Sequence, residues 1–453
     1  MDEPPPFRVD VAFPRATSRH RHHPVNDMHT PFSNGRIFRG WFVVAAAFAI
    51  TFVGYGCAYT FSVFVESLQR DFGASRGSVS LVYSIAGFLY CSFGMISGPL
   101  ADRWGARRLA VLGMALLGAG LMLASAAHSL VQVYAAYGLG IGLGIGCAYV
   151  PALGAVQRWF VKRRGFASGL AVSGIGVGTL AMPPLASHLI DALGWRETWL
   201  ILGGIAAILG MGMSLLVEDN PGARGLAPDG GLASTETRDT KRSGASIGEA
   251  LKSRQFIGLY AACLICSFGV FVPFVHLVPY AVDHGITRSS AVVLLGVIGV
   301  GSTAGRFVLG GIADRMGRQR FLLVMFLGIG LALATWAFAT GFWTLVVFAL
   351  LFGVTYGGWV AILPAVVVDH FGDRHVCTIL GILYTSVAFG TLIGPTAAGF
   401  VFNVNHSYTL PIVASAGANI LAAIIAWRAS KTTRESGSKR AASKCLRATS
   451  IAP

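Results

Sequence analysis

Long stretches without any Asp, Glu, Lys or Arg constrain this chain more than any other feature. A membrane-spanning helix needs about 20 mainly apolar residues, so the longest stretches hold two helices each. The segment 289–313 is also long enough, although it carries one charge, Arg306. The sequence therefore predicts six spanning helices before residue 218 and six after residue 255. The charge-free stretches are residues 41–65, 77–101, 109–157, 165–190, 198–217, 255–282, 321–368 and 375–427.

The overall composition agrees with lipid as the solvent. Only 12% of the residues are charged, against about 25% in an ordinary soluble domain. The mean hydropathy is +0.65. In lipid every backbone polar group must be satisfied within the protein, and helices achieve this within one segment. The fold class we predict is an all-α membrane protein.

The basic residues are concentrated on one side of the predicted helix array. Thirty of the 35 Lys and Arg residues lie in the two tails and in every second loop, whereas the intervening loops hold only Arg70, Arg76, Arg196 and Arg288. This bias is the positive-inside pattern, which places both termini in the cytoplasm. The net charge of +15 therefore reflects topology, and we expect no nucleic-acid partner.

The composition also suggests where the parts of the chain begin and end. We expect a disordered cytoplasmic N-terminal tail at 1–39 and a basic cytoplasmic tail at 429–453. The segment 218–254 is rich in Gly, Ser, Thr and charged residues, as in flexible linkers. It would join one six-helix half at 40–217 to a second six-helix half at 255–428. We expect the protein to reside in the inner or plasma membrane.

An internal repeat relates the two halves. The sequence GPLADRWGARR, from Gly98 to Arg108, returns in the second half as GGIADRMGRQR, from Gly310 to Arg320. Each copy lies between the second and third helices of its half, where glycine permits a tight turn and a carboxylate could hold a neighbouring helix end. We expect a conformational gating loop formed by Gly98, Asp102, Arg103, Gly105, Arg107, Arg108, Asp314, Arg315 and Gly317.

This duplicated loop resembles the signature of the major facilitator superfamily. The sequence WFVKRRGFASGLAVSGIGVG, from Trp159 to Gly178, is similar to a segment of monocarboxylate porters and their bacterial oxalate/formate-porter relatives. The sequence PFVHLVPY, from Pro273 to Tyr280, resembles the same group. The resemblance implies the major facilitator fold, with twelve transmembrane helices as two six-helix halves around a central site.

Among the candidate substrate-binding residues, Arg306 has the clearest physical basis. A charge in mid-membrane costs at least about 2.5–3.5 kcal/mol, so it faces a cavity or a partner. No other predicted helix carries an acid near its centre, and Gly301 and Gly305 would leave room beside the guanidinium. Its planar fork matches a carboxylate. The alternatives are that the side chain snorkels to the membrane surface or forms an internal ion pair. The resemblance supports the anion site, because monocarboxylate porters carry an arginine in the eighth helix.

The chain departs from the family pattern at two positions. Animal monocarboxylate porters carry an aspartate four residues before this arginine and a lysine in the first helix, where this chain has Ser302 and, nearby, Tyr59. The missing aspartate argues against lactate-type proton symport through that residue. Tyr59 and Tyr384 are further substrate-binding candidates, because the resemblance places their helices around the cavity. His276 either titrates or binds substrate, or it satisfies a backbone carbonyl freed by a proline.

These observations favour a secondary active transporter of a small organic carboxylate, working by alternating access with proton symport or anion exchange. The alternatives are efflux of an amphipathic compound and, in a different class, a membrane sensor that kept the transporter fold. We expect no enzyme activity, catalytic residue, metal or cofactor, because the sequence has no nucleotide-binding or catalytic motif. The expected partners are the organic anion, the bilayer and, in the symport case, protons, and we expect a monomer.

Overall fold

The computed structural model describes residues 38–161, 163–230, 245–372 and 375–449. Within them, twelve helical spans are long and apolar enough to cross a membrane, which confirms the predicted number. The predicted N-terminal tail, apart from Phe38 and Arg39, and the middle of the predicted linker lie outside the described residues.

The first half contains six spans, of which three consist of more than one helical segment. They are α1 (Gly40–Tyr59) with α2 (Phe61–Phe72); α3 (Arg76–Trp104); α4 (Ala106–Ser125); α5 (Leu130–Val133) with η1 (Tyr134–Leu139) and α6 (Gly140–Trp159); α7 (Arg164–Leu193); and α8 (Trp195–Ile205) with η2 (Ala206–Gly210) and α9 (Met211–Ser214). Short helices follow: η3 (Pro221–Arg224), η4 (Pro228–Gly230) and α10 (Ile247–Lys252).

The second half repeats this plan. Its spans are α11 (Arg254–Val270) with α12 (Val272–Asp283), α13 (Arg288–Met316), α14 (Arg318–Phe338), α15 (Phe342–Phe371), α16 (Val376–Asn405) and α17 (Thr409–Thr449). The first and seventh spans are each interrupted, at Thr60 and at Phe271. The same interruption at matching places is a further sign of the duplication.

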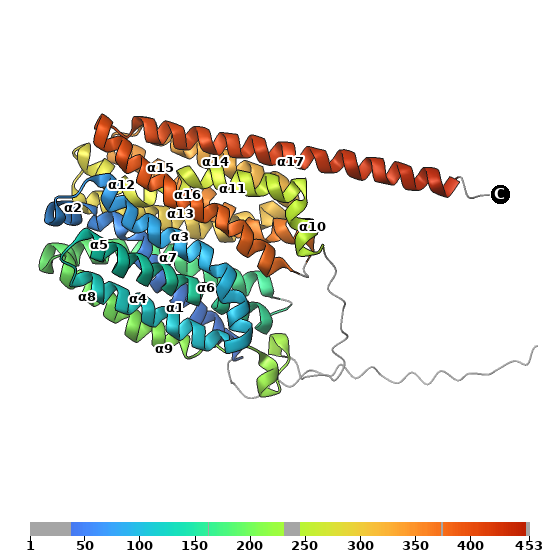
Figure 1. The fold of residues 1–453 in the computed structure, drawn as a ribbon, viewed down its shortest axis with the longest axis horizontal. Helices are drawn as coiled ribbons and strands as arrows, with labels where there is room; N and C mark the ends of the chain where they lie inside the picture. The colour runs from blue at the N-terminus through green and yellow to red at the C-terminus, as the bar shows by residue number, and fades with distance from the viewer. Residues whose placement is uncertain (1–37, 162, 231–244, 373–374, 450–453) are drawn as a thin grey trace, which may run out of the picture. The chain divides into compact units, whose positions relative to one another are not determined.

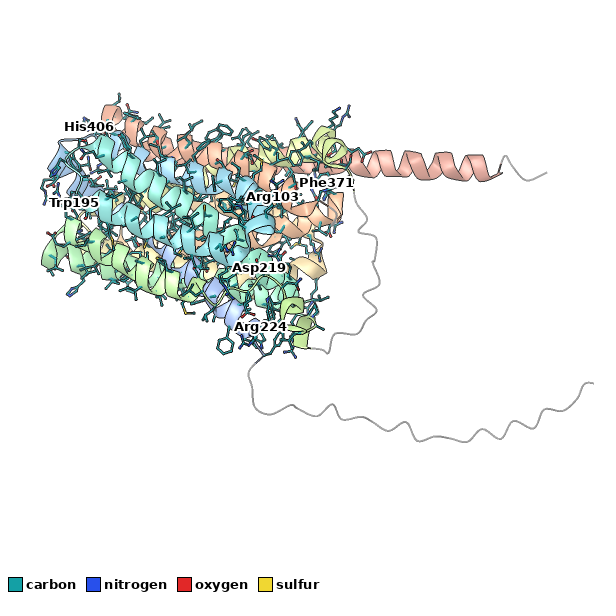
Figure 2. All side chains as sticks on the ribbon, turned by 60° about the horizontal axis from the view of Figure 1, so that its bottom comes forward. Arg103, Trp195, Asp219, Arg224, Phe371 and His406 are labelled. Carbon is teal, nitrogen blue, oxygen red and sulfur yellow. The ribbon has the colours of Figure 1, made fainter. Side chains whose placement is uncertain are left out.

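The helix ends define two faces of the membrane domain (Figure 1). We call the face where α2 and α12 end and α3 and α13 begin the far side. The opposite face, where α1 begins and α10 lies, is called the tail side. Figure 2 shows His406 and Trp195 at the far side and Arg103, Asp219 and Phe371 at the tail side.

Matching residues start and end the second helix of each half. Ser75 and Thr287 cap α3 and α13, since their side chains accept hydrogen bonds from the backbone N–H of Ser78 and Ser290. Gly105 and Gly317 follow the same helices with φ of 90° and 87°. A side chain would be strained in that backbone region, which explains why the duplicated loop has glycine at both positions.

Within the described residues, three pairs of spans make the most extensive contacts between the two halves. α3 contacts α16, α7 contacts α13, and α2 contacts α12. The approach of α7 to α13 depends on glycine, because a Cβ atom on Gly176 would lie 2.8 Å from the carbonyl oxygen of Gly299. Small residues permit such close helix packing in lipid. These contacts bring side chains from α1, α6, α13, α15 and α16 together in mid-membrane.

Candidate substrate site between the halves

Arg306 lies on α13 with 7% of its surface exposed. Its Nη1 donates a 3.3 Å hydrogen bond to the carbonyl oxygen of Val172 on α7, in the other half. Its Nε and Nη2 atoms are buried and find no hydrogen-bond acceptor among the residues that the structure describes. Buried donors are normally satisfied, so these two N–H groups are available to an acceptor that enters the site.

The glycines beside Arg306 act differently from the sequence-based expectation. Gly301 and Gly305 face the backbone of α15: a Cβ on Gly301 would lie 2.7 Å from the carbonyl oxygen of Leu350, and one on Gly305 would clash with that of Val354. They therefore create close helix contact rather than free space around the guanidinium. Tyr356, which lies near the charge of Arg306, belongs to the same helix α15.

Tyrosines from both halves surround Arg306. Tyr149 and Tyr356 lie near enough to interact electrostatically with its charge. The hydroxyls of Tyr59 and Tyr356 are hydrogen-bonded at 2.8 Å, and the rings of Tyr55 and Tyr149 are 5.4 Å apart. Tyr384 is buried within electrostatic range of Tyr149 and Tyr356. We call Arg306, Tyr55, Tyr59, Tyr149, Tyr356 and Tyr384 the arginine–tyrosine cluster. The structure thus brings together three of the four predicted substrate-binding residues.

His276, the fourth predicted residue, is engaged elsewhere. It is fully buried on α12, with Nε2 at 2.8 Å from the carbonyl oxygen of Pro395 and Nδ1 at 3.1 Å from the hydroxyl of Tyr408. Ser80 approaches Nε2 at 3.3 Å. One of the two interpretations of this residue was that it satisfies a backbone carbonyl freed by a proline. The acceptor here is instead the carbonyl oxygen of Pro395 itself, on α16 of the same half.

The predicted gating loop is described in part. Arg107 donates through Nε to the carbonyl oxygen of Val217 at 2.8 Å, while Arg103, Arg108 and Arg315 are exposed. Gly98 is in ordinary contact distance of Val150. The side chains of Asp102 and Asp314 lie outside the described part of the structure, so the expected carboxylate contact stays a prediction.

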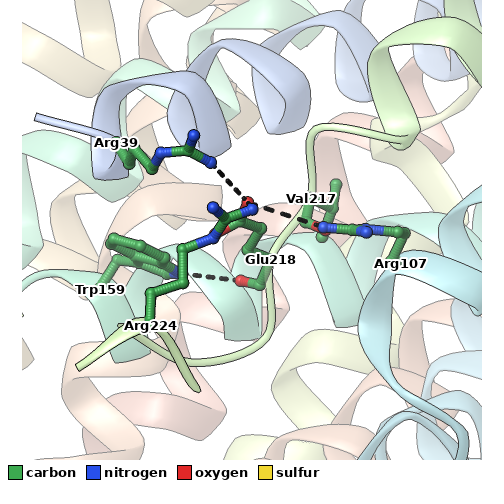
Figure 3. A network of polar contacts seen from close by, with 6 residues as sticks. All are labelled: Arg39, Arg107, Trp159, Val217, Glu218 and Arg224. Carbon is green, nitrogen blue, oxygen red and sulfur yellow. Dashed lines mark hydrogen bonds and ion pairs between the residues drawn. The ribbon is translucent and has the colours of Figure 1, made fainter. Parts of the chain in front are cut away.

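A network around Glu218 was missed by the sequence reasoning (Figure 3). Three arginines reach its carboxylate: Arg224 through Nε at 2.9 Å and Nη2 at 2.7 Å, Arg39 at 3.3 Å and Arg107 at 3.7 Å. Trp159 donates to its carbonyl oxygen at 2.8 Å. Glu218 is only 15% exposed, so it joins the tail-side ends of α1, α4 and α6 to the start of the linker.

The neighbouring Asp219 extends this network. Its carboxylate accepts a hydrogen bond from the backbone N–H of Ala106, the first residue of α4. The helix dipole stabilises a negative charge at this end of a helix. Arg158 donates to its carbonyl oxygen at 2.8 Å. The available sequence signal was the Glu218–Asp219 pair itself, which stands directly after an apolar span and among predominantly basic loops.

The chain matches a family model described as Major Facilitator Superfamily over residues 46–341 and 277–452. It is 31% identical over 394 residues to monocarboxylate transporter 3 of Rattus norvegicus, covering 85% of this chain and 78% of the relative. It is 29% identical over 409 residues to monocarboxylate transporter 12-B of Danio rerio, covering 85% and 86% of the two chains.

A solved structure shares the fold. The crystal structure of a bacterial homologue of the human lysosomal transporter Spinster superposes with a TM-score of 0.66 at 16% identity, covering 88% of this chain and 98% of that one. The predicted fold of two six-helix halves is therefore confirmed, and the family consists of transporters rather than enzymes. The chain belongs to the major facilitator superfamily and, within it, to the multi-pass membrane transporters that resemble the monocarboxylate porters.

Proposed function

We propose that this transporter carries a small organic carboxylate through a central site at Arg306, by alternating access between the halves. The observation that supports this most is the pair of buried, unsatisfied donors on the guanidinium, Nε and Nη2. These two atoms form one edge of the planar fork, which suits the two oxygens of a carboxylate. The names of the relatives, monocarboxylate transporters, agree with this substrate class.

The charge balance supports coupling by anion exchange or by proton symport. Arg306 has no ion pair with any residue that the structure describes, so a bound carboxylate would neutralise it. In exchange, a second anion takes the place of the first and keeps the site neutral. In symport, a proton binds elsewhere on the protein, because the aspartate of the animal porters is replaced by Ser302.

We also propose the topology and the role of the duplicated loop. The basic tails and the 218–254 linker would lie in the cytoplasm of a plasma-membrane protein, in accordance with the positive-inside pattern. The gating loop would hold helix ends on the tail side in one state of the cycle through Asp102 and Asp314. The interaction of Arg107 with Val217 supports such a bracing role.

Uptake into proteoliposomes tests the substrate class. Purified protein is assayed with a panel of labelled monocarboxylates and with their amides as uncharged analogues. We expect uptake of one or more carboxylates, reduced about tenfold or more in Arg306→Lys because the bidentate fork is lost, and abolished in Arg306→Ala. Arg254→Ala is the matched control, since Arg254 is exposed at the tail side. Unchanged carboxylate uptake by Arg306→Ala would refute the proposal, and uptake of the amides alone would favour an amphipathic substrate.

A further inference from the structure

Arg76 connects the two halves at the far side. It is the first residue of α3, and its Nη1 and Nη2 lie 2.5 Å and 2.8 Å from the two carboxylate oxygens of Asp283, at the end of α12. Its backbone N–H donates to the side chain of Asn403 on α16 at 3.2 Å. The guanidinium carbon also lies 4.1 Å from the ring centroid of Phe402. A bidentate pair with an aromatic partner is a strong contact, and here it spans the halves.

The internal repeat supplies a reciprocal contact. When the two copies of the duplicated loop are aligned, Arg288, the first residue of α13, occupies the position of Arg76. Its Nη2 donates to the carbonyl oxygen of Val63 on α2 at 2.9 Å, and its Nη1 is 3.6 Å from Asp191 on α7. Each arginine thus reaches from its own half into the other. The same alignment pairs Asp191 with Asn403.

A third arginine at the far side provides a contrast within one half. Arg196, at the start of α8, forms an ion pair with Asp71 at the end of α2, and Trp195 donates to the same carboxylate at 3.0 Å. Asp71 and Asp283 are also equivalent in the alignment of the two halves. The equivalent carboxylates are therefore used differently, since Asp71 stabilises its own half and Asp283 holds the other.

A series of hydrogen bonds leads from Arg76 through Tyr408 to His276. The chemistry of each group determines which atom donates and which accepts. Burial raises the pKa of Tyr408 to about 12, so its hydroxyl keeps its hydrogen at neutral pH. The carbonyl oxygen of Pro395 can only accept, so Nε2 of His276 carries the hydrogen. Nδ1 is then an acceptor for the O–H of Tyr408, whose oxygen in turn accepts from Nη1 of Arg76 at 3.1 Å.

A second hydrogen on His276 would disrupt these hydrogen bonds. A hydrogen on Nδ1 would turn the O–H of Tyr408 away, and the hydroxyl oxygen would then have to accept from both His276 and Arg76. The other nearby titratable groups among the described residues are Tyr280 on the same helix and, behind it, His284. Both carboxylate oxygens of Asp283 are taken by Arg76, and α3 contributes that arginine and Ser80. An imidazolium would therefore meet a like charge and a reversed hydrogen bond in a buried place.

We propose that Arg76 and Arg288 form a far-side gate between the halves, and that His276 is a proton-binding site that opens it. The closed gate holds neutral His276, whereas opening exposes the imidazole to water, where histidine binds protons at about pH 6.5. Protonation favours the open gate, since the buried site of the closed gate disfavours an imidazolium beside Arg76. The inference rests on alternating access in the proposed function, but not on a carboxylate being the substrate.

Hydrogen–deuterium exchange of the full-length protein without substrate tests the gate. At pH 8 we expect Arg76→Gln and Arg288→Gln to raise exchange of the far-side ends of α3 and α12 about tenfold or more, as expected when a charged hydrogen bond is lost. Exchange at the tail-side ends should fall, because the opposite face closes as the gate opens. Arg196→Gln breaks an ion pair within one half and is the matched control, which should leave exchange of these α3, α12 and tail-side peptides as in the wild type.

Two results would overturn the gate. One is unchanged far-side exchange in both arginine variants, and the other is an equal effect of Arg196→Gln. If Arg76→Gln raises exchange everywhere, it has unfolded the protein, and the exchanged pair Arg76→Asp with Asp283→Arg decides instead. Restored far-side protection in that double variant supports the gate, whereas continued loss of protection refutes it.

The proton site is tested by comparing pH 8 with pH 5.5, after correction for the intrinsic pH dependence of amide exchange. We expect far-side exchange in the wild type to rise at pH 5.5 relative to tail-side peptides of the same sample. His276→Gln, which can still donate to Pro395, should lose this difference. A wild type without a pH effect, or an equal effect in His276→Gln, would refute the proton site. Because no substrate is present, failure of carboxylate uptake would leave both results standing.

Discussion

The hydroxyl of Tyr59 on α1 and the hydroxyl of Tyr356 on α15 lie 2.8 Å apart, which forms a hydrogen bond between the two halves in mid-membrane. The ring of Tyr59 also stacks on Phe274 of α12, with centroids 4.2 Å apart. Tyr356 lies near the charge of Arg306. A substrate bound at Arg306 therefore meets a pair of hydroxyls that satisfy each other and can turn towards it.

Tyr59→Phe removes one hydroxyl and leaves that of Tyr356 unpaired. We expect the KM for the transported carboxylate to change by about threefold to tenfold, the usual value of one hydrogen bond, with normal amounts of folded protein. Tyr260→Phe is the control, because its hydroxyl bonds Thr385 within one half at 3.0 Å. Transport kinetics in proteoliposomes give the KM of both variants. Equal KM values for Tyr59→Phe and the wild type would exclude a role of this pair in binding.

Arg306→Leu removes a buried cation whose Nε and Nη2 have no acceptor among the described residues. We expect the substrate-free variant to melt at the same temperature as the wild type or higher, since a buried unpaired charge costs free energy. We expect the transported carboxylate to stabilise the wild type but not the variant. Thermal unfolding with and without substrate measures this, and equal stabilisation of both would place the anion elsewhere.

Glu218→Gln keeps the shape of the side chain but removes the charge shared by Arg39, Arg107 and Arg224. We expect a lower melting temperature, corresponding to a loss of about 1–3 kcal/mol for a charged hydrogen-bond network. Glu66→Gln is the control, because the ion pair of Glu66 with Arg70 is exposed and worth about 0.5 kcal/mol or less. Equal melting temperatures of the two variants would show that Glu218 does not brace the helix ends.

A cysteine in place of Gly230 tests the sidedness, in a variant whose other reactive cysteines are replaced. If the linker is cytoplasmic, a membrane-impermeant maleimide should label this position only after the cells are opened. A cysteine at Gly73, in the turn between α2 and α3, should be labelled in intact cells. The reverse pattern would invert the proposed topology.

The membrane-spanning helices could be predicted from the sequence, because segments that are buried in lipid contain almost no charged residues. Charge-free stretches predict twelve helices, and the repeat predicts two halves, both of which the structure confirms. Arg306 stood out for the same reason, since one charge within an apolar span is visible without coordinates. Its Val172 contact was not predictable, because the acceptor is a backbone carbonyl on another helix.

The contacts at the two faces were harder to predict. Arg76 and Asp283 are far apart in the sequence, and each looks like an ordinary loop charge when it is considered alone. Aligning the two halves on the duplicated loop would have linked Arg76 to Arg288, but it could not show that these arginines cross between the halves while Arg196 does not. Such choices depend on the relative placement of helices, which no local pattern specifies.

The uninterrupted length of α13 has a mechanical consequence that is not apparent from its single residues. It is one helix of 29 residues, about 43 Å long at 1.5 Å per residue, and no proline interrupts it. Arg288 stands at one end, Arg306 stands in mid-membrane, and the second copy of the duplicated loop includes the other end. If binding at the proposed site tilts this helix, both of its ends move at once and in opposite directions, without any relay of side-chain rearrangements.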